Sequence, residues 1–217
     1  MIVEDLGRMA YREAWTYQEK VHELVLGGGE ERLLLVEHPP VITFGRRPGV
    51  AKNMVALPEQ LAKMGVEVVE SDRGGDITFH GPGQLVAYPI IRMANHQMTV
   101  GGYVHTLEDI VIATLTQLGF SGATKDAAAV GVWIPDGDTA TKALAKVCAI
   151  GVRIRKGISM HGIALNVETD LRYFELIVPC GLVGRPVTSL KKLTGERAPA
   201  MEAVKKALAE GFVGRFG

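Results

Sequence analysis

Apolar residues recur at helical spacing in four parts of the chain. The first part runs from residue 10 to residue 25 and ends at the glycines 27–29. The second covers 104–118, with Thr99 as its predicted cap and Gly119 after its end. Spacings of three and four residues place apolar side chains on one helix face, so these segments predict amphipathic helices. The remaining two predicted helices are 58–64, with proline in its first turn, and 201–212.

Apolar runs with the composition of strands lie between these helices. They are rich in valine, isoleucine, leucine and aromatic residues, and they end at glycine, proline or charged residues. The helices and strands do not alternate regularly, as they would in a doubly wound parallel sheet. We therefore expect an α+β fold, a mixed and largely antiparallel sheet with flanking helices, in a single domain over residues 1–217. The predicted strands are 2–6, 32–37, 41–45, 66–71, 84–91, 128–134, 143–155 and 162–168.

The predicted strand 143–155 carries one lysine among apolar residues. Regular alternation places Lys146 on one face with Cys148, Ile150, Val152 and Ile154, and it places Val147, Ala149, Gly151 and Arg153 on the other. A lysine on an apolar face either extends its ammonium to water at the end of the strand or is held there for chemistry. The pattern alone leaves both interpretations open.

The stretch RGGDITFHGPGQ, residues 73–84, places four glycines between two strand-like runs. It matches neither of the glycine-rich phosphate-binding motifs, so it does not predict nucleotide binding. One interpretation is a glycine-rich hairpin. The other is a wall along which a substrate lies, because glycines permit close backbone approach and the polar side chains can orient a ligand. Those polar side chains are Arg73, Thr78, His80 and Gln84.

The chain has two cysteines and six histidines, and none of them is spaced as metal ligands usually are. Cys148 falls within a predicted strand, where a cysteine behaves as a small apolar residue. Cys180 lies between a proline and a glycine, outside any periodic pattern, which indicates a loop. A cysteine nucleophile needs a nearby cation to stabilise its thiolate, and a lysine brought alongside would provide one.

Composition and charge narrow the class of protein further. Of the 217 residues 47% are hydrophobic and 22% charged, which is typical of a folded protein that needs neither disulfides nor metal. The 24 basic and 24 acidic residues give no net charge, which argues against general attraction to nucleic acid or to a membrane surface. No apolar run is long enough for a membrane span, and the first residues do not resemble a signal peptide. We expect a cytoplasmic protein.

Taken together, these stretches resemble the octanoyltransferases of lipoate biosynthesis. The family signature is similar to RGGDITFHGPGQLVAY, residues 73–88 of this chain. Further matches are LLLVEHPPVITFGR (33–46), KVCAIGVRIRKGISMHGIALNV (146–167) and NVETDLRYFELIVPCG (166–181). The resemblance covers nearly the whole chain, with the motifs in the family's order.

The resemblance implies a fold similar to the catalytic domain of biotin and lipoate protein ligases, and a Cys–Lys dyad. By motif match Cys180 forms the acyl thioester and Lys146 lowers the pKa of its thiol. Two departures from the family are Asp76, where a neutral polar residue is common, and Cys148, where alanine is expected and which adds a second thiol near the dyad. The implied substrate-binding residues are Arg73, Gly74, Gly75, Asp76, Ile77, Thr78, Phe79, His80, Ala149, Ile150, Gly151, Gly162, Ile163 and Ala164.

The same resemblance implies an octanoyl-[acyl carrier protein]:protein N-octanoyltransferase. The donor would be octanoyl-acyl carrier protein, and the acceptors would be apo lipoyl domains of 2-oxoacid dehydrogenase complexes and the glycine cleavage H protein. No cofactor and no metal would be needed, because a thioester is already activated. One alternative is an ATP-dependent lipoate or biotin protein ligase. Another is a noncatalytic module that binds lipoyl domains, in which Cys180 would be dispensable.

Overall fold

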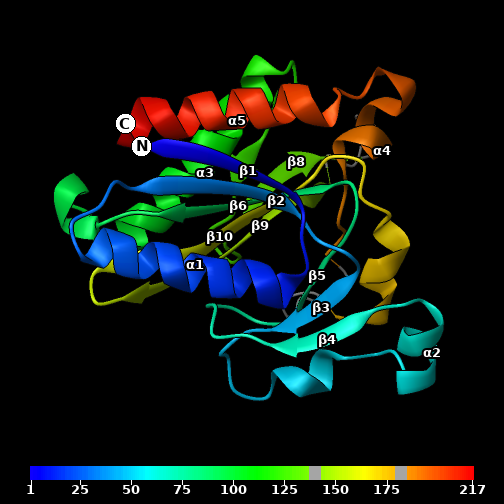
Figure 1. Ribbon diagram of the computed structural model, residues 1–217. Coiled ribbons are helices and arrows are strands. Elements are labelled where there is room, and N and C mark those ends of the chain that lie inside the picture. The colour runs from blue at the N-terminus through cyan, green and yellow to red at the C-terminus, as the bar shows by residue number, and fades with distance from the viewer. Residues whose placement is uncertain (137–142, 179–184) are drawn as a thin grey trace.

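The computed structural model describes residues 1–136, 143–178 and 185–217. In this part of the chain the strands form a seven-stranded sheet in the order β1-β2-β6-β10-β9-β8-β7 and a three-stranded sheet in the order β4-β3-β5 (Figure 1). The larger sheet consists of β1 (Ile2–Arg8), β2 (Arg32–Glu37), β6 (Gln84–Ile90), β7 (Thr124–Lys125), β8 (Val132–Pro135), β9 (Leu144–Arg155) and β10 (Ile158–Asn166). The smaller sheet consists of β3 (Val41–Phe44), β4 (Glu67–Glu70) and β5 (Thr78–His80).

Most neighbouring strands run antiparallel. Within the described residues only β1 with β2 and β3 with β4 are parallel pairs. The expected α+β fold with a mixed, largely antiparallel sheet is therefore confirmed. Two strands were not predicted, the short β7 and β5, and β5 lies inside the glycine-rich stretch 73–84.

Helices cover both faces of the larger sheet (Figure 1). On one face α1 buries the apolar stripe Ala14, Val21 and Val25 against residues of β2, β6 and β10. On the other face α3 and α5 pack on the sheet in the largest core, and Thr99 caps α3 as predicted, its hydroxyl accepting from the Gly102 N–H at 3.1 Å. The helices are α1 (Tyr11–Leu26), α2 (Pro58–Lys63), α3 (Val100–Gln117), α4 (Leu190–Thr194) and α5 (Met201–Phe216), with 3-10 turns at Val50–Asn53, Met93–His96, Leu171–Leu176 and Gly195–Arg197.

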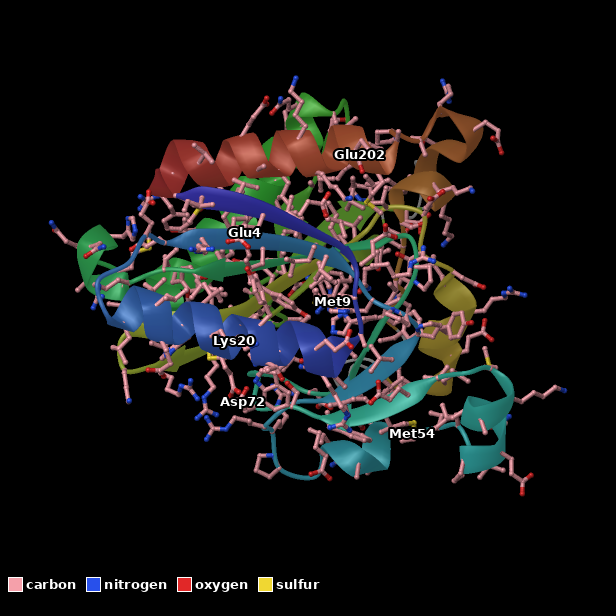
Figure 2. All side chains as sticks on the ribbon, viewed as in Figure 1. Glu4, Met9, Lys20, Met54, Asp72 and Glu202 are labelled. Carbon is pink, nitrogen blue, oxygen red and sulfur yellow. The ribbon has the colours of Figure 1, made fainter. Side chains whose placement is uncertain are left out.

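The three-stranded sheet has a core of its own beside the larger sheet. Phe79 of β5 stacks on Tyr173 with ring centroids 4.6 Å apart, and Ile42 and Ile77 pack around them. Ring stacking of this kind fixes the backbone of β5, and so fixes the residues on either side of it. In Figure 2 Asp72 lies between helix α1 and this smaller sheet, at the start of the glycine-rich stretch.

A β-bulge in β9 corrects one prediction from the sequence. Val132 of β8 pairs with Cys148, but the next residue, Trp133, pairs with Lys146, so Val147 is an extra residue in β9. An extra residue reverses the alternation of side chains beyond it. Cys148 accordingly packs in the core on the α3 side. The expectation that Lys146 shares a face with Cys148 was wrong.

No helix in the described ranges is both long enough and apolar enough to cross a membrane.

Candidate active site

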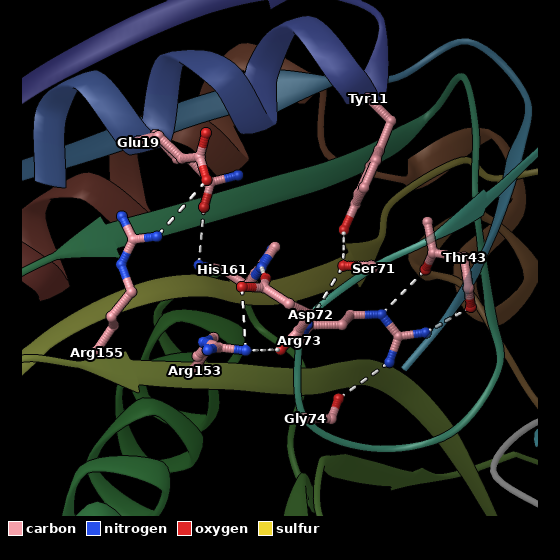
Figure 3. A network of polar contacts seen from close by, with 11 residues as sticks. Tyr11, Glu19, Thr43, Ser71, Asp72, Arg73, Gly74, Arg153, Arg155 and His161 are labelled. Atoms are coloured by element: carbon pink, nitrogen blue, oxygen red, sulfur yellow. Dashed lines mark hydrogen bonds and ion pairs between the residues drawn. The ribbon is translucent and has the colours of Figure 1, made fainter. Parts of the chain in front are cut away.

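The loop that leads into the glycine-rich stretch is tied to helix α1. The Tyr11 hydroxyl and the Ser71 hydroxyl lie 2.8 Å apart, and the Ser71 oxygen also accepts from the Arg73 N–H at 3.3 Å (Figure 3). Both side chains are buried. A buried hydroxyl pair of this kind fixes the loop relative to the helix, because breaking it would leave polar groups unsatisfied.

The guanidinium of Arg73 holds the loop to the smaller sheet. Its Nε donates to the Thr43 hydroxyl at 3.0 Å, and its terminal nitrogens donate to the Thr43 carbonyl at 2.7 Å and to the Gly74 carbonyl at 3.1 Å (Figure 3). Arg73 is buried, and the planar fork of its guanidinium suits several acceptors at fixed angles. Arg73 therefore positions the glycine-rich loop as well as lining the site.

Glycines occur where this loop crosses β9. The Gly74 N–H donates to the Val152 carbonyl at 3.0 Å, and a Cβ added at Gly74 would lie 2.8 Å from that same oxygen. A Cβ added at Gly151 would lie 2.8 Å from the Gly74 carbonyl oxygen. Backbone meets backbone here with no space for side chains, which explains two of the glycines in the predicted site.

Small residues on the sheet below form the floor of a cavity. Ala164 of β10 pairs with Val86 of β6 on one side and with Ala149 of β9 on the other. Two residues further along, Gly162 pairs with Gly151. Rows of side chains on one face of a strand are about 7 Å apart, so these two rows describe a shallow trough about that long.

Most of the predicted substrate-binding residues line this cavity. Gly74 lines an adjoining cavity instead, and Phe79 is packed in the core of the smaller sheet. Four lining residues were not among those predicted: Tyr11, Val86, Tyr88 and His161. The predicted residues that line the cavity are Arg73, Gly75, Asp76, Ile77, Thr78, His80, Lys146, Ala149, Ile150, Gly151, Gly162, Ile163 and Ala164.

Lys146 lines the cavity and is almost fully enclosed. Its residue is only 7% exposed, so the alternative in which its ammonium extends into water is wrong. The Nζ atom donates to the Val130 carbonyl at 2.9 Å and lies 4.8 Å from the centroid of the Trp133 ring. A Cβ added at Gly131 would lie 3.2 Å from the Lys146 Cε atom, so this glycine gives the lysine its space. Carbonyl and ring together hold a cation facing the cavity.

Tyr88 lines the cavity, and His38 supports it from outside the lining. The Nδ1 atom of His38 lies 2.7 Å from the Met9 carbonyl oxygen, which can only accept, so this nitrogen carries the proton. The other ring nitrogen, Nε2, then accepts from the Tyr88 hydroxyl at 2.8 Å. Burial lowers the pKa of His38 to about 4, and the hydrogen bond to Met9 opposes this only in part.

His80 and Tyr11 form the neighbouring wall. Their rings are stacked with centroids 5.8 Å apart, and His80 Nδ1 lies 2.7 Å from the Gln84 Oε1 atom. Burial, with smaller contributions from the nearby His38 and Arg73, lowers the pKa of His80 well below its ordinary value. His80 is therefore neutral, and it orders the wall without adding charge to it.

His161 is the residue whose importance sequence reasoning missed. Its φ of 56° is rare for a residue other than glycine, and it persists because its neighbours determine it on several sides. Its Nε2 lies 2.7 Å from Asp72 Oδ1, and its backbone N–H donates to Gln18 Oε1 at 2.8 Å (Figure 3). Burial lowers the pKa of His161, and the Asp72 carboxylate opposes that shift. In the sequence His161 stood just before the predicted strand 162–168 and inside the motif 146–167, with no role assigned to it.

Of the two cysteines, the structure describes Cys148 but not Cys180. Cys180, the predicted nucleophile, lies outside the described residues. Cys148 is fully buried in the core, and burial raises the pKa of its thiol to about 12. The expected second thiol near the dyad is therefore protonated and packed on the α3 side of the sheet.

The cavity combines an apolar trough with neutral polar groups, two cationic side chains, Lys146 and Arg73, and one carboxylate, Asp76. Such a site suits an apolar chain whose reactive end lies near Lys146. Among the described residues no group of three or more histidine, cysteine, aspartate or glutamate side chains is placed to hold a metal ion.

Comparison with known proteins adds a family to this geometry. Residues 10–213 match the family described as the lipoyl protein ligase A/B catalytic domain. An octanoyltransferase of Chloroflexus aurantiacus is 45% identical over 210 residues, which cover 96% of this chain and 90% of that protein. An octanoyltransferase of Nitratidesulfovibrio vulgaris is 43% identical over 212 residues, which cover 98% of this chain and 93% of that protein.

Solved structures with low sequence identity share the fold. The structure of a bipartite lipoate protein ligase from Thermoplasma acidophilum gives a TM-score of 0.78 at 20% identity, over 99% of this chain and 82% of that chain. A lipoate-protein ligase A bound with ATP gives 0.78 at 19% identity, over 99% and 84%. The expected likeness to the ligase fold is confirmed. With its matching profile and its relatives at more than 40% identity, the chain belongs to the octanoyltransferases of the lipoyl protein ligase A/B catalytic domain family.

Proposed function

We propose that this chain is an acyltransferase that moves an octanoyl or lipoyl group from acyl carrier protein to a lysine of a lipoyl domain. The observation that carries the proposal is a single cavity that joins Lys146 to a trough of alanine and glycine residues. Relatives named octanoyltransferases along almost the whole chain support the same reaction. We propose Cys180 as the nucleophile, in one domain that acts in the cytoplasm.

In the first half of the reaction, the Cys180 thiolate attacks the carbonyl carbon of the donor thioester. A bond forms between Cys180 sulfur and that carbon, and the bond to the sulfur of the carrier protein's arm breaks. The leaving thiolate takes a proton from the Lys146 ammonium. Backbone N–H groups of the glycine-rich loop are candidates to stabilise the tetrahedral oxyanion.

In the second half, the ε-amine of the lipoyl-domain lysine attacks the thioester on Cys180. An amide forms, the bond to Cys180 sulfur breaks, and Lys146 regains its proton from the attacking amine. The thiolate and the ammonium are then restored for another cycle.

The trough accounts for the choice of an acyl chain as substrate. Ala149 and Ala164 leave space above the sheet that larger side chains would fill, whereas Gly151 and Gly162 let neighbouring backbone, at Gly74 and Ala87, come close to the sheet. Each methylene that leaves water for such a site contributes about 0.8 kcal/mol. Several methylenes together provide the binding free energy, while the polar groups orient the thioester.

An ATP-dependent ligase is the second candidate, because the solved ligase structures share the fold. Those structures are about 20% identical to this chain, whereas the relatives named octanoyltransferases reach 45%. The donor thioester supplies the activation that a ligase obtains from ATP, so the transferase requires no nucleotide. A noncatalytic module that binds lipoyl domains is the third candidate.

Intact-mass measurement separates these three functions. Wild type incubated with octanoyl-acyl carrier protein should gain one octanoyl group without ATP, and Cys180→Ser should gain none. The labelled enzyme should then transfer the group to an apo lipoyl domain. Activity that survives Cys180→Ser and requires ATP would establish a ligase, and binding of the lipoyl domain without any transfer would establish a binding module.

A further inference from the structure

Two cavities meet at the reactive end of the proposed acyl site. The second has a volume of about 330 Å³ and lies between the glycine-rich loop and residues 128–130. Both cavities are lined by Gly75, Asp76 and Lys146. Among the described residues that line either cavity, Asp76 is the only carboxylate. The cationic residues of the two linings are Arg47, Arg73 and Lys146.

The two oxygens of Asp76 have different surroundings. Oδ1 accepts from the Asn53 side-chain amide at 2.8 Å and from the Ile77 N–H at 2.7 Å, so this oxygen holds the loop. Among the described residues the partner of Oδ2 is Arg47, at 3.5 Å, the outer limit of a hydrogen bond. The side chain of Arg47 is 61% exposed and that of Asp76 only 4%. Oδ2 is thus a buried anionic oxygen with acceptor capacity left over.

The second half of the proposed reaction needs such an oxygen. The acceptor lysine arrives as an ammonium with three protons on nitrogen, and the amide that it becomes retains one. Lys146, neutral after the first half, can take one of the two protons that must leave. The arriving cation also enters a site that already holds basic residues, which repel it unless an anion lies close by.

We propose that Asp76 Oδ2 binds the ammonium of the incoming acceptor lysine in the cavity beside Lys146. This inference rests on the proposed function and assigns the acceptor its own contact within the site. The ammonium donates one hydrogen bond to Asp76 and passes one proton to Lys146. The resulting amine attacks the thioester carbon, and the second proton leaves by way of the Asp76 carboxylate to bulk water as the bond to Cys180 sulfur breaks.

We expect the Asp76 carboxylate to act in the reaction through its negative charge, and we expect the fold to tolerate a neutral side chain of the same shape. In Asp76→Asn the side-chain oxygen can still accept from Asn53 and Ile77, and an amide group replaces the anionic oxygen. The test starts from acyl-enzyme prepared with octanoyl-acyl carrier protein and freed of donor. It follows the loss of the octanoyl adduct by intact mass after addition of either apo lipoyl domain or hydroxylamine, a nucleophile that is uncharged near neutral pH.

Asp76→Asn should slow the reaction of the acyl-enzyme with the lipoyl-domain lysine far more than its reaction with hydroxylamine. We expect the rate constant with lipoyl domain to fall at least about tenfold, as befits loss of a close charge partner, and the rate constant with hydroxylamine to change by much less. Equal losses with both nucleophiles, or no loss with either, would overturn the proposal. Asp5→Asn, which removes one of the two carboxylate partners of Lys205 on the α5 side of the sheet, is the matched control.

Asp76→Gln serves as a second variant if Asp76→Asn does not accumulate as folded protein, as judged by thermal unfolding. If neither neutral variant folds, the carboxylate is structural and the proposal is wrong. Failure of the proposed acyltransferase function can be told apart from failure of this proposal about Asp76. In the first case the wild-type protein itself would form no octanoyl adduct on Cys180.

Discussion

The hydroxyl of Tyr88 donates to the Nε2 atom of His38 across 2.8 Å, and this bond exists only while that nitrogen is unprotonated. Tyr88 lies on β6 and lines the cavity, and His38 follows directly after β2. Burial lowers the pKa of His38 to about 4, so near neutral pH the ring is uncharged and its Nε2 atom accepts this bond. Stability should consequently depend on pH in a definite direction.

The free energy of unfolding should fall when the pH is lowered from about 6.5 to about 4. An unfolded His38 binds a proton near pH 6.5, whereas the folded one resists until about pH 4, so acid favours the unfolded chain in that window. The contribution is on the order of 3 kcal/mol, at about 1.4 kcal/mol for each pKa unit. Urea unfolding at several pH values measures it.

His38→Gln is the control for this prediction. A glutamine amide can donate to the Met9 carbonyl and accept from the Tyr88 hydroxyl without titrating. The dependence on pH should become shallower but not vanish, because the pKa values of His80 and His161 are lowered in the same direction. A variant with the full wild-type dependence would show that His38 is not its source.

Cys148 should not react with alkylating reagents in the folded protein. Its thiol is fully buried and its pKa is raised to about 12, so almost no thiolate exists at about pH 8. Iodoacetamide should add one group to the native protein, at Cys180, and two groups in urea. Cys148→Ala should still give the single native adduct. Peptide mapping that finds native label on Cys148 would contradict the assigned burial.

Lys146→Met should raise the pH at which Cys180 reacts with iodoacetamide. Methionine keeps the apolar stem beside Trp133 but removes the ammonium, and an opposite charge close to a thiol typically lowers its pKa by one to several units, roughly 1.4 kcal/mol for each. The rate of alkylation against pH gives the shift. Lys125→Met, which removes the partner of Asp109 on the surface, should leave the profile unchanged. An unchanged profile in Lys146→Met would remove this lysine from the dyad.

Local patterns in the sequence predicted four of the five helices in the described residues, all but α4, and most strands, because their causes are local. Thr99 caps α3 within one turn, and the apolar stripe of α1 needs only its own spacing. The face on which Lys146 lies could not be predicted in this way. It depends on the extra residue Val147, which appears only when β9 pairs with β8. A strand taken alone alternates regularly, so the sequence placed the lysine with Cys148.

The residues around the cavity also fall into two groups, those that the sequence predicted and those that only contacts between distant segments bring to the cavity. Those within the glycine-rich stretch and in β9, and all but His161 in β10, were expected, because the resemblance to the family implies a substrate-binding or catalytic role for them. Tyr11 and Tyr88 join the cavity through contacts with Ser71 and His38, and His161 joins it through Asp72. Each of these contacts connects residues at least 50 positions apart, and no local pattern encodes such a distance.

The wall that Tyr11 forms in the cavity should set the length of the acyl chain. Tyr11 stacks on His80, lies 5.3 Å from the ring of His38, and lines the cavity that also contains Lys146. Tyr11→Leu shortens this wall and should admit two more methylenes. At about 0.8 kcal/mol for each, the ratio of kcat/KM for decanoyl to octanoyl donors should rise about tenfold.

Tyr11→Phe separates the effect of the ring, which fills space in the cavity, from the effect of the hydroxyl, which holds the loop. It removes the hydrogen bond to Ser71, as Tyr11→Leu also does, but it keeps the ring that stacks on His80. Chain-length preference should therefore stay with octanoyl in Tyr11→Phe, even if both variants lose stability through the loosened loop. Competition between octanoyl and decanoyl donors in one reaction, read by intact mass of the acylated lipoyl domain, measures the preference directly. If Tyr11→Leu and Tyr11→Phe shift the preference for decanoyl over octanoyl donors equally, the contact between the hydroxyl and Ser71 controls chain length. The role assigned to the Tyr11 ring would then be wrong.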